Sequence, residues 1–134
     1  MTDLPPQNPL ETLLKSAMDG QTSIGGFMKA FVAAEVIVLN GSLVTPDGSG
    51  FDPLVFDDNG TRYVAVFTDM ARLGVHTQQA PYVAQMKLIH VLRFLHDRYP
   101  AHGVVVNPGV SLGMELSAAG IGEILKDFAD PFRP

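Results

Sequence analysis

The chain has 134 residues, a formal net charge of -5, 46% hydrophobic residues and no cysteine. A chain of this length buries about two thirds of its unfolded surface, so we expect one domain over residues 1–134 with a core over about 8–128. The absence of cysteine excludes disulfides, thiol nucleophiles and cysteine-based zinc sites. Nine basic residues against fourteen acidic ones argue against nucleic-acid binding, which needs clustered Lys and Arg.

Two helices are predicted first along the chain. Asn8, Pro9 and Glu11 resemble a capping box that starts a helix ending near Gly20. The second helix starts after Thr22 or Ser23, and its predicted apolar stripe is Ile24, Phe27, Phe31 and Ala34. No stretch of the sequence reads as a secretory signal or is apolar over the roughly 20 residues that a bilayer needs. We therefore expect a cytoplasmic protein without membrane contact.

The middle of the chain predicts strands. Residues 36–39 form a β-branched run typical of a buried strand, and the Gly- and Pro-rich segment 40–53 is expected to be a long, mobile surface loop. Residues 54–56 and 63–67 flank the turn sequence 57–60, which predicts a β-hairpin. The hairpin is expected to lead into a short helical turn.

The second half predicts helices around one further buried strand. Thr68 or Asp69 is expected to cap a turn at 70–73, residues 74–81 are expected to be irregular, and a long helix is predicted over 82–98. Its predicted solvent stripe is Lys87, His90, Arg93 and Asp97, and its predicted buried side is Leu88, Val91, Leu92, Leu95 and Tyr99. A strand at 103–107, an extended segment at 114–116 and a helix from Ser117 to about 128 follow.

These elements predict an α+β fold with a mixed sheet of about five strands and helices packed on it. The strands at 63–67 and 104–107 are separated by a helix, so they are expected to be parallel in one βαβ unit with a right-handed crossover. Parallel strands end at the same edge of a sheet, and residues that follow them should therefore lie close together.

Polar side chains gather at that expected edge. Thr68 and Asp69 follow one strand and Asn107 follows its neighbour. The predicted ligand- or partner-binding rim consists of Thr68, Asp69, Arg72, Asn107, Ser111 and Glu115. Binding beyond the carboxyl ends of strands favours a functional rim, whereas helix capping by Thr68 or Asp69 and a local turn at Asn107 are the structural alternatives.

Other chemical motifs are weak. Gly109 to Gly113 fits the G-x-S-x-G pattern of a nucleophile elbow around Ser111, but the last histidine, His102, precedes it, whereas a triad of that type needs an acid and a histidine after the serine. His90 and His96 are six residues apart, which is not a zinc-ligand spacing. We therefore predict no catalytic constellation, no metal and no cofactor.

Several segments together resemble a known family. These are E-V-I-V at 35–38, V-F-T-D at 66–69, G-V-V-V-N-P-G at 103–109 and E-L at 115–116. Over roughly residues 8–128 the chain resembles the amino-terminal domain of the SseB (enhanced serine sensitivity) family. The resemblance implies a bacterial, cytoplasmic α+β domain with no established activity, substrate or cofactor, often followed by a carboxy-terminal domain in other members.

The sequence thus favours a non-enzymatic interaction or regulatory module that holds a protein or peptide partner at the polar rim, with the 40–53 loop beside it. The alternative is a small-molecule binding protein or small enzyme in which Asp69 or Glu115 is a general base and Asn107 orients the substrate. A homodimer through the remaining apolar helix face is a third option.

Overall fold

The computed structural model describes residues 5–43, 52–110 and 112–129. The α-helices are α1 (Pro9–Met18), α2 (Ile24–Ala33), α3 (Leu88–Arg98) and α4 (Ala118–Ile124). The strands are β1 (Glu35–Asn40), β2 (Val55–Asp58), β3 (Thr61–Val66), β4 (Tyr82–Lys87), β5 (Gly103–Val106) and β6 (Met114–Leu116). Two 3-10 helices, η1 (Met70–Arg72) and η2 (Gly74–Gln78), and a π-helical turn, η3 (Leu125–Ala129), complete the set. The predicted α+β class is confirmed.

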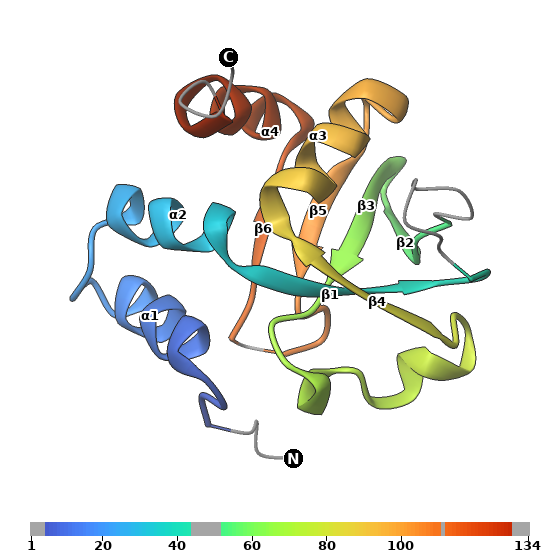
Figure 1. Cartoon of the computed structure of the whole chain (residues 1–134), viewed down its shortest axis with the longest axis horizontal. Coiled ribbons are helices and arrows are strands. Elements are labelled where there is room, and N and C mark those ends of the chain that lie inside the picture. Colours follow the sequence, from blue (N-terminus) through green and yellow to red (C-terminus); the bar gives the residue numbers. More distant parts are fainter. Residues whose placement is uncertain (1–4, 44–51, 111, 130–134) are drawn as a thin grey trace.

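The strands form two sheets, where the sequence predicted one sheet of about five strands. One sheet has the order β2-β3-β5-β6 and the other pairs β1 with β4. Within the larger sheet β3 and β5 are parallel, as predicted, and the other neighbours are antiparallel. Ile37 of β1 and Phe67, directly after β3, exchange two backbone hydrogen bonds of 2.8 Å. This bridge joins β1 to the larger sheet (Figure 1).

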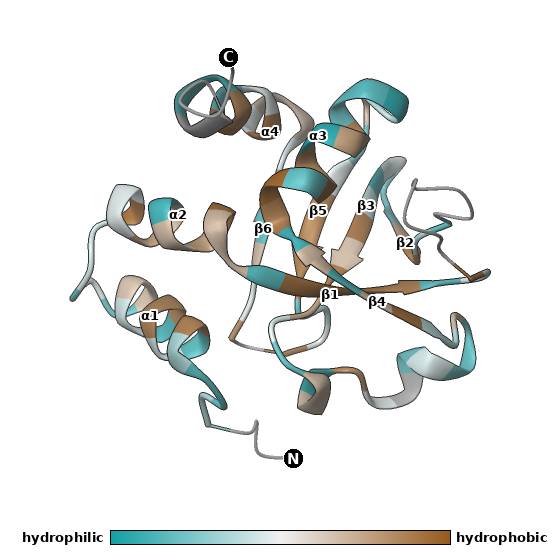
Figure 2. Ribbon diagram, viewed as in Figure 1, coloured by the Kyte–Doolittle hydropathy of each residue, from teal (hydrophilic) through white to brown (hydrophobic). Residues whose placement is uncertain are grey.

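The core lies on both faces of β1 and β3. Val36 and Val38 of β1 belong to the larger apolar cluster, with side chains from the four α-helices, whereas Ile37 and Leu39 belong to a second cluster with Phe67 and with Leu73, which links η1 to η2. A strand buried on both faces reads as a continuous apolar run rather than an alternating one. Figure 2 shows this as a largely hydrophobic β1.

The first two helices begin where the sequence predicted. Asn8 and Ser23 cap α1 and α2, and each side-chain oxygen accepts a hydrogen bond from a backbone N–H three residues later. The predicted stripe on α2 needs two corrections, because Ile24 is 62% exposed at the first turn of the helix and Ala34 is the half-buried C-cap after its last residue. Met28 and Val32 are buried beside Phe27 and Phe31 in their place.

The predicted long helix over 82–98 is wrong in its first six residues. Tyr82–Lys87 is β4, paired antiparallel with β1, and α3 begins only at Leu88. The segment Ala84 to Lys87 favours a helix locally, but pairing with residues 35–38 of β1, much earlier in the chain, overrides this preference. Four of the five residues predicted for the buried side of α3 are buried, and Ile89 is buried with them. The fifth, Tyr99, follows the helix and is 40% exposed.

The hairpin is confirmed, with a tight turn. Asn59 and Gly60 have φ of 53° and 87°, the left-handed conformation that a two-residue hairpin turn of this kind requires. The predicted loop over 40–53 is shorter than expected, because Asn40 ends β1 and its Oδ1 accepts a hydrogen bond from Asp52 N at 3.1 Å. The rest of that prediction concerns residues 44–51, which lie outside the described residues.

Candidate functional site

The ends of β3 and β5 bring Thr68 and Asn107 together. Val66 and Val106 are paired at the end of the parallel ladder, and Asn107 N donates to Val66 O. Asn107 Oδ1 accepts from Thr68 N at 3.0 Å, and its Nδ2 donates to Thr68 Oγ1 and to Leu112 O, both at 2.8 Å. Asn107 has φ of 52°, a left-handed conformation that asparagine tolerates better than most residues. Its side chain therefore ties the two strand ends and the following turn together.

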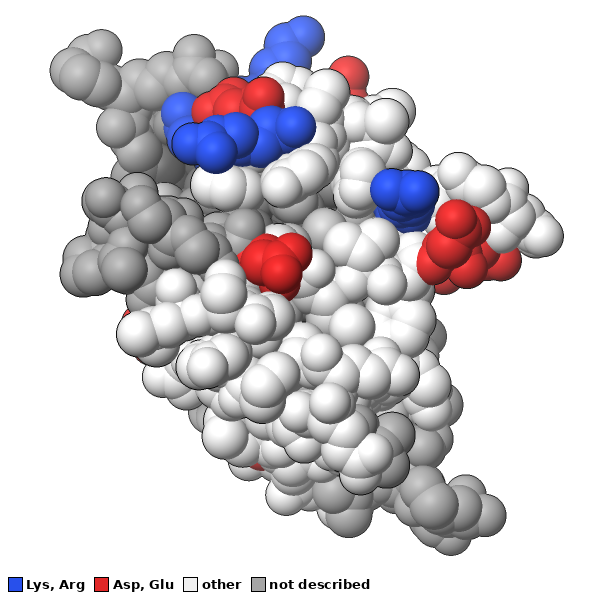
Figure 3. Space-filling view, turned by 90° about the vertical axis from the view of Figure 1, so that its right-hand side faces the viewer, with Lys and Arg blue, Asp and Glu red and all other residues white. Residues whose placement is uncertain are grey.

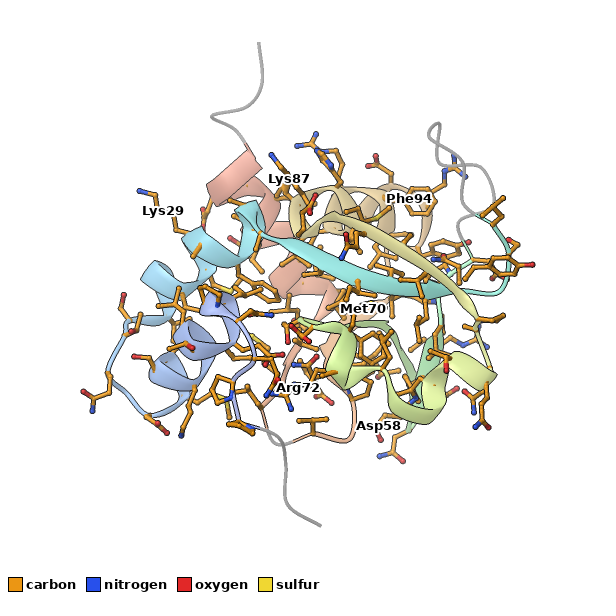
Figure 4. The ribbon with its side chains drawn as sticks, turned by 60° about the horizontal axis from the view of Figure 1, so that its bottom comes forward. Lys29, Asp58, Met70, Arg72, Lys87 and Phe94 are labelled. Atoms are coloured by element: carbon orange, nitrogen blue, oxygen red, sulfur yellow. The ribbon has the colours of Figure 1, made fainter. Side chains whose placement is uncertain are left out.

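A buried ion pair lies next to these two residues. Arg72 of η1 donates to both carboxylate oxygens of Glu11 in α1, from Nη2 to Oε1 at 2.8 Å and from Nε to Oε2 at 3.0 Å. The two side chains are 2% and 0% exposed. Thr68 Oγ1 also donates to Glu11 Oε2, which links the ion pair to Asn107. Figure 4 shows Arg72 in the space between α1 and η1.

The pKa of Glu11 reflects these partners. Burial raises the pKa of its carboxyl, but hydrogen bonds from Arg72, from Thr68 and from Gln7 N–H, with the positive charge of Arg72, lower it by more. The pKa of Glu11 therefore lies below the ordinary value for glutamate. The group is a stable carboxylate at neutral pH and is not poised to take up a proton as a general base.

Asn8 and Asp69 close the cluster toward solvent. Asn8 Nδ2 donates to Thr68 O at 2.7 Å and to Asp69 Oδ2 at 3.0 Å. Asp69 Oδ1 accepts from Ala71 N at 3.0 Å, so Asp69 caps η1. The capping alternative stated for Asp69 is therefore confirmed. We call the group Asn8, Glu11, Thr68, Asp69, Arg72 and Asn107 the strand-end cluster.

Four of the six residues of the predicted rim lie in this cluster: Thr68, Asp69, Arg72 and Asn107. Glu115 is exposed in β6 opposite Val105 and takes no part in the cluster's hydrogen bonds, and Ser111 lies outside the described residues. Thr68, Arg72 and Asn107 are buried, and no buried side-chain nitrogen or oxygen among the described residues lacks a hydrogen-bond partner. The cluster thus acts as a polar core, and partner binding by the rim stays a prediction.

Sequence reasoning missed Glu11, which it assigned to a capping box. A signal was present, because Glu11, Leu14 and Ala17 are three residues apart and form the buried face of α1. A carboxylate on a buried helix face needs a partner. The sequence does not say which basic residue that partner is, and the structure shows it to be Arg72, 61 positions along the chain.

A second region has unpaired backbone groups. Leu88 N donates to Ala34 O at 2.9 Å, and hydrogen-bonded positions alternate along an antiparallel pair. Ala84 and Met86 therefore direct their backbone groups toward β1, and Val83 and Gln85 direct theirs away from it. Within the described residues, no backbone hydrogen bond involves the outward groups of Val83 and Gln85. We call this outward side of the strand the β4 edge.

The segment that leads into β4, and β4 itself up to Met86, carry little charge. Residues 70–86 contain no Asp or Glu, and Arg72 is buried. Met70, Tyr82 and Val83 are 55%, 45% and 44% exposed. The lower half of the face in Figure 3, the side on which η1 and η2 lie in Figure 1, is almost free of charged side chains.

A cavity of about 410 Å³ lies at the opposite end of the sheet from the strand-end cluster. Its lining residues are Asp52, Pro53, Val55, Asp57, Arg62, Val64, Tyr99 and His102.

Groups of three or more His, Asp or Glu side chains that could hold a metal ion are absent from the part of the chain that the structure describes.

A family model described as the SseB protein N-terminal domain matches residues 10–123. No curated protein and no solved structure matches the chain. None of the helices in the described ranges has the length and apolar character needed to cross a membrane.

Proposed function

The chain belongs to the SseB protein N-terminal domain family, and on that premise we propose that it is a non-enzymatic interaction module that binds an extended protein segment along the β4 edge. One observation carries the proposal: the outward N–H and C=O groups of Val83 and Gln85 are unpaired among the described residues, on a strand whose one charged residue is Lys87 at its end. Exposed strand edges of this kind are templates for pairing with another chain.

Addition of a partner strand would use both features of the β4 edge, its unpaired backbone groups and its exposed apolar side chains. A partner strand gains affinity from main-chain hydrogen bonds and specificity from alternate side chains. Tyr82 and Val83 present exposed apolar surface next to the unpaired groups. Natural edge strands are usually blunted by charges or proline. In β4 such residues stand only at the two ends, Pro81 before the strand and Lys87 as its last residue, and residues 82–86 carry neither.

The strand-end cluster supports the module indirectly. Its donors and acceptors are bonded to each other, so a partner that used Arg72 or Asn107 would first have to break a buried ion pair or a strand-end hydrogen bond. Among the described members of the predicted rim, Asp69 and Glu115 are the accessible ones. Substitutions at these two residues therefore distinguish a partner bound at the predicted rim from a partner bound at the β4 edge.

The experiment selects random linear peptides displayed on phage against the wild-type chain and measures the affinity of the enriched peptides by fluorescence anisotropy. We expect peptides with alternating β-branched or aromatic residues, whose binding weakens at least about tenfold when alternate backbone nitrogens are methylated. Gln85→Pro and Val83→Lys should reduce binding similarly, because the first removes an outward N–H and the second adds a charge to the edge.

The matched controls are Asp69→Ala and Glu115→Ala, which should bind the same peptides with wild-type affinity. Two results would overturn the proposal. One is binding that N-methylation leaves unchanged, and the other is loss of binding in the rim variants but not in Gln85→Pro or Val83→Lys.

A second candidate function is small-molecule binding, favoured by the cavity of about 410 Å³. Arg62, His102 and Tyr99 offer hydrogen-bond donors, and Asp52 and Asp57 offer acceptors. A thermal-shift screen against a metabolite library, repeated with Arg62→Gln, tests this candidate. A shift that Arg62→Gln abolishes would support it, and no shift with any compound would remove its motivation.

A further inference from the structure

We propose that the cavity beside the β2-β3 hairpin binds a small aromatic monocarboxylate, with the carboxylate on Arg62 and the ring against Tyr99. The proposal rests on the second candidate function and names the ligand class for the same cavity. It does not depend on the β4 edge, because the lining residues come from the hairpin, from Asp52 and Pro53 before it, and from the chain after α3.

The hairpin supplies one wall of the cavity. Val55 of β2 lies directly opposite Val64 of β3, and nearer the turn Asp57 lies opposite Arg62. Side chains at directly opposite positions of an antiparallel pair lie on the same face of the sheet. Val64 is fully buried and belongs to the larger apolar cluster, whereas Asp57 and Arg62 are exposed. The wall is therefore apolar where it meets the core and charged near the turn.

Arg62 carries a positive charge that has no carboxylate partner within the part of the chain that the structure describes. Neither of the ion pairs found there includes Arg62. Its cross-strand neighbour Asp57 instead accepts a hydrogen bond at Oδ1 from Gly60 N at 3.0 Å, in the hairpin turn. A guanidinium binds a carboxylate through two parallel N–H···O hydrogen bonds. Arg62 can therefore anchor the carboxylate of a ligand.

Two aromatic rings line the cavity from the chain that follows α3. The rings of Tyr99 and His102 have centroids 5.2 Å apart, and His102 N donates to Tyr99 O at 2.9 Å, which closes the turn between them. The Tyr99 side chain is 40% exposed. Aromatic rings pair with a further ring in offset-stacked or edge-to-face geometry. A planar aromatic ligand is therefore favoured over a saturated one of the same size.

The two carboxylates of the cavity limit the charge of the ligand. Asp52 and Asp57 line the same space as Arg62, so a ligand with two negative charges, such as a phosphate monoester, would be repelled. A monocarboxylate matches the single guanidinium. The volume of about 410 Å³ lies toward the lower end of the range of about 300–1,000 Å³ for ligand pockets, which fits a small ligand of one or two rings.

An NMR titration of isotope-labelled wild type with benzoate tests the proposal. We expect the largest amide shift changes at the residues that line the cavity, and a dissociation constant of about 5 mM or tighter for a ligand of this size. Cyclohexanecarboxylate, which has the same number of non-hydrogen atoms and no aromatic ring, should bind about threefold more weakly. Phenyl phosphate, which carries a second negative charge, should bind at least about tenfold more weakly.

Two pairs of variants assign the contacts. Arg62→Gln should weaken benzoate binding at least about tenfold, because it removes the charged donor, and Tyr99→Ala should weaken it about threefold. The matched controls are Lys29→Gln, which removes an exposed charge on α2, and Tyr82→Ala, at a tyrosine 45% exposed in β4. Both controls should bind benzoate with wild-type affinity. All four substituted residues are exposed, so the variants are expected to fold.

Four results would overturn the proposal. They are no shift change at about ten times the expected dissociation constant, shift changes confined to residues outside the cavity, affinities for phenyl phosphate or cyclohexanecarboxylate equal to that for benzoate, and equal losses in the variants and their controls. A thermal shift with another compound that Arg62→Gln abolishes would in that case still support small-molecule binding at the cavity. The failure of the ligand class is therefore distinguishable from the failure of the candidate function, and peptide binding at the β4 edge is measured separately.

Discussion

The strand-end cluster and the β4 edge differ in where their polar groups find partners. The cluster consists of polar and charged side chains, and its buried hydrogen-bond donors and acceptors are bonded within the chain. The β4 edge offers mainly backbone, and that backbone is unpaired among the described residues. The comparison shows that polar side chains gathered at one place can form a buried polar core and need not form a binding site. Unpaired backbone groups at the surface are the better indication of where a partner can bind.

The first prediction, with the largest expected effect, tests whether the ion pair between Glu11 and Arg72 is buried. Glu11→Gln leaves Arg72 buried without a counter-charge, so we expect a loss of about 3–5 kcal/mol in the free energy of unfolding. The exposed pair Lys15–Asp19, with an Nζ to Oδ2 distance of 3.0 Å, supplies the control. Asp19→Asn should cost less than about 1 kcal/mol, and chemical denaturation measures both variants.

A similar small loss for Glu11→Gln and Asp19→Asn would mean that the cluster is open to solvent. The double variant Glu11→Leu/Arg72→Met sharpens the test, because removing both charges together costs less than removing one of them.

The second prediction concerns Asn107. Asn107→Ala removes the hydrogen bonds to Thr68 and Leu112 and keeps a Cβ in the left-handed conformation, so we expect a loss of about 2–3 kcal/mol. Asn107→Gly loses the same bonds but relieves the backbone, and should be about 1 kcal/mol more stable than Asn107→Ala. Equal stabilities of the two variants in urea denaturation would contradict the assigned backbone role.

The third prediction compares two prolines placed next to each other in β4. Ala84→Pro removes an N–H that faces β1 and should cost about 1–3 kcal/mol. Gln85→Pro removes an N–H that faces outward, so its cost should be under about 1 kcal/mol in the monomer, because proline is tolerated at free edges. Thermal unfolding of dilute samples measures both, and a larger loss for Gln85→Pro would show that its N–H is bonded within the chain.

The fourth and smallest effect is the pH dependence of stability. Because the pKa of Glu11 is lower in the folded chain than the unfolded value of about 4.3, the carboxylate contributes stability that is fully present at neutral pH. That contribution decreases as the pH falls below about 4.3 toward the folded pKa. Denaturation of wild type and Glu11→Gln from pH 6 to pH 3 should show this component in wild type alone.

Local patterns predicted most of the fold. The caps at Asn8 and Ser23, the hairpin turn at Asn59 and the parallel pairing of β3 with β5 follow from short-range signals. The strand conformation of segment 82–87 does not follow from local signals, because it depends on pairing with residues 35–40 of β1, which lie far away in the sequence. Local helix preference and distant strand pairing compete there, and only the three-dimensional contact decides between them.

The sequence predicted where the strand-end cluster lies but did not predict that its side chains are buried. Topology alone places Thr68 and Asn107 side by side, since parallel strands end at one edge. The docking of α1 over that edge, with Glu11 reaching Arg72, is a tertiary contact between residues about 60 positions apart. The open β4 edge could not be predicted while residues 82–87 were assigned to a helix.

Amide hydrogen exchange, followed residue by residue by NMR, tests the contrast between the two regions most directly. The account predicts that the Thr68 amide, bonded to Asn107 Oδ1, is protected. The Val83 and Gln85 amides should exchange quickly, whereas the Ala84 and Met86 amides, which face β1, should stay protected. Fast exchange at Thr68, or equal protection of these four β4 amides, would contradict the account.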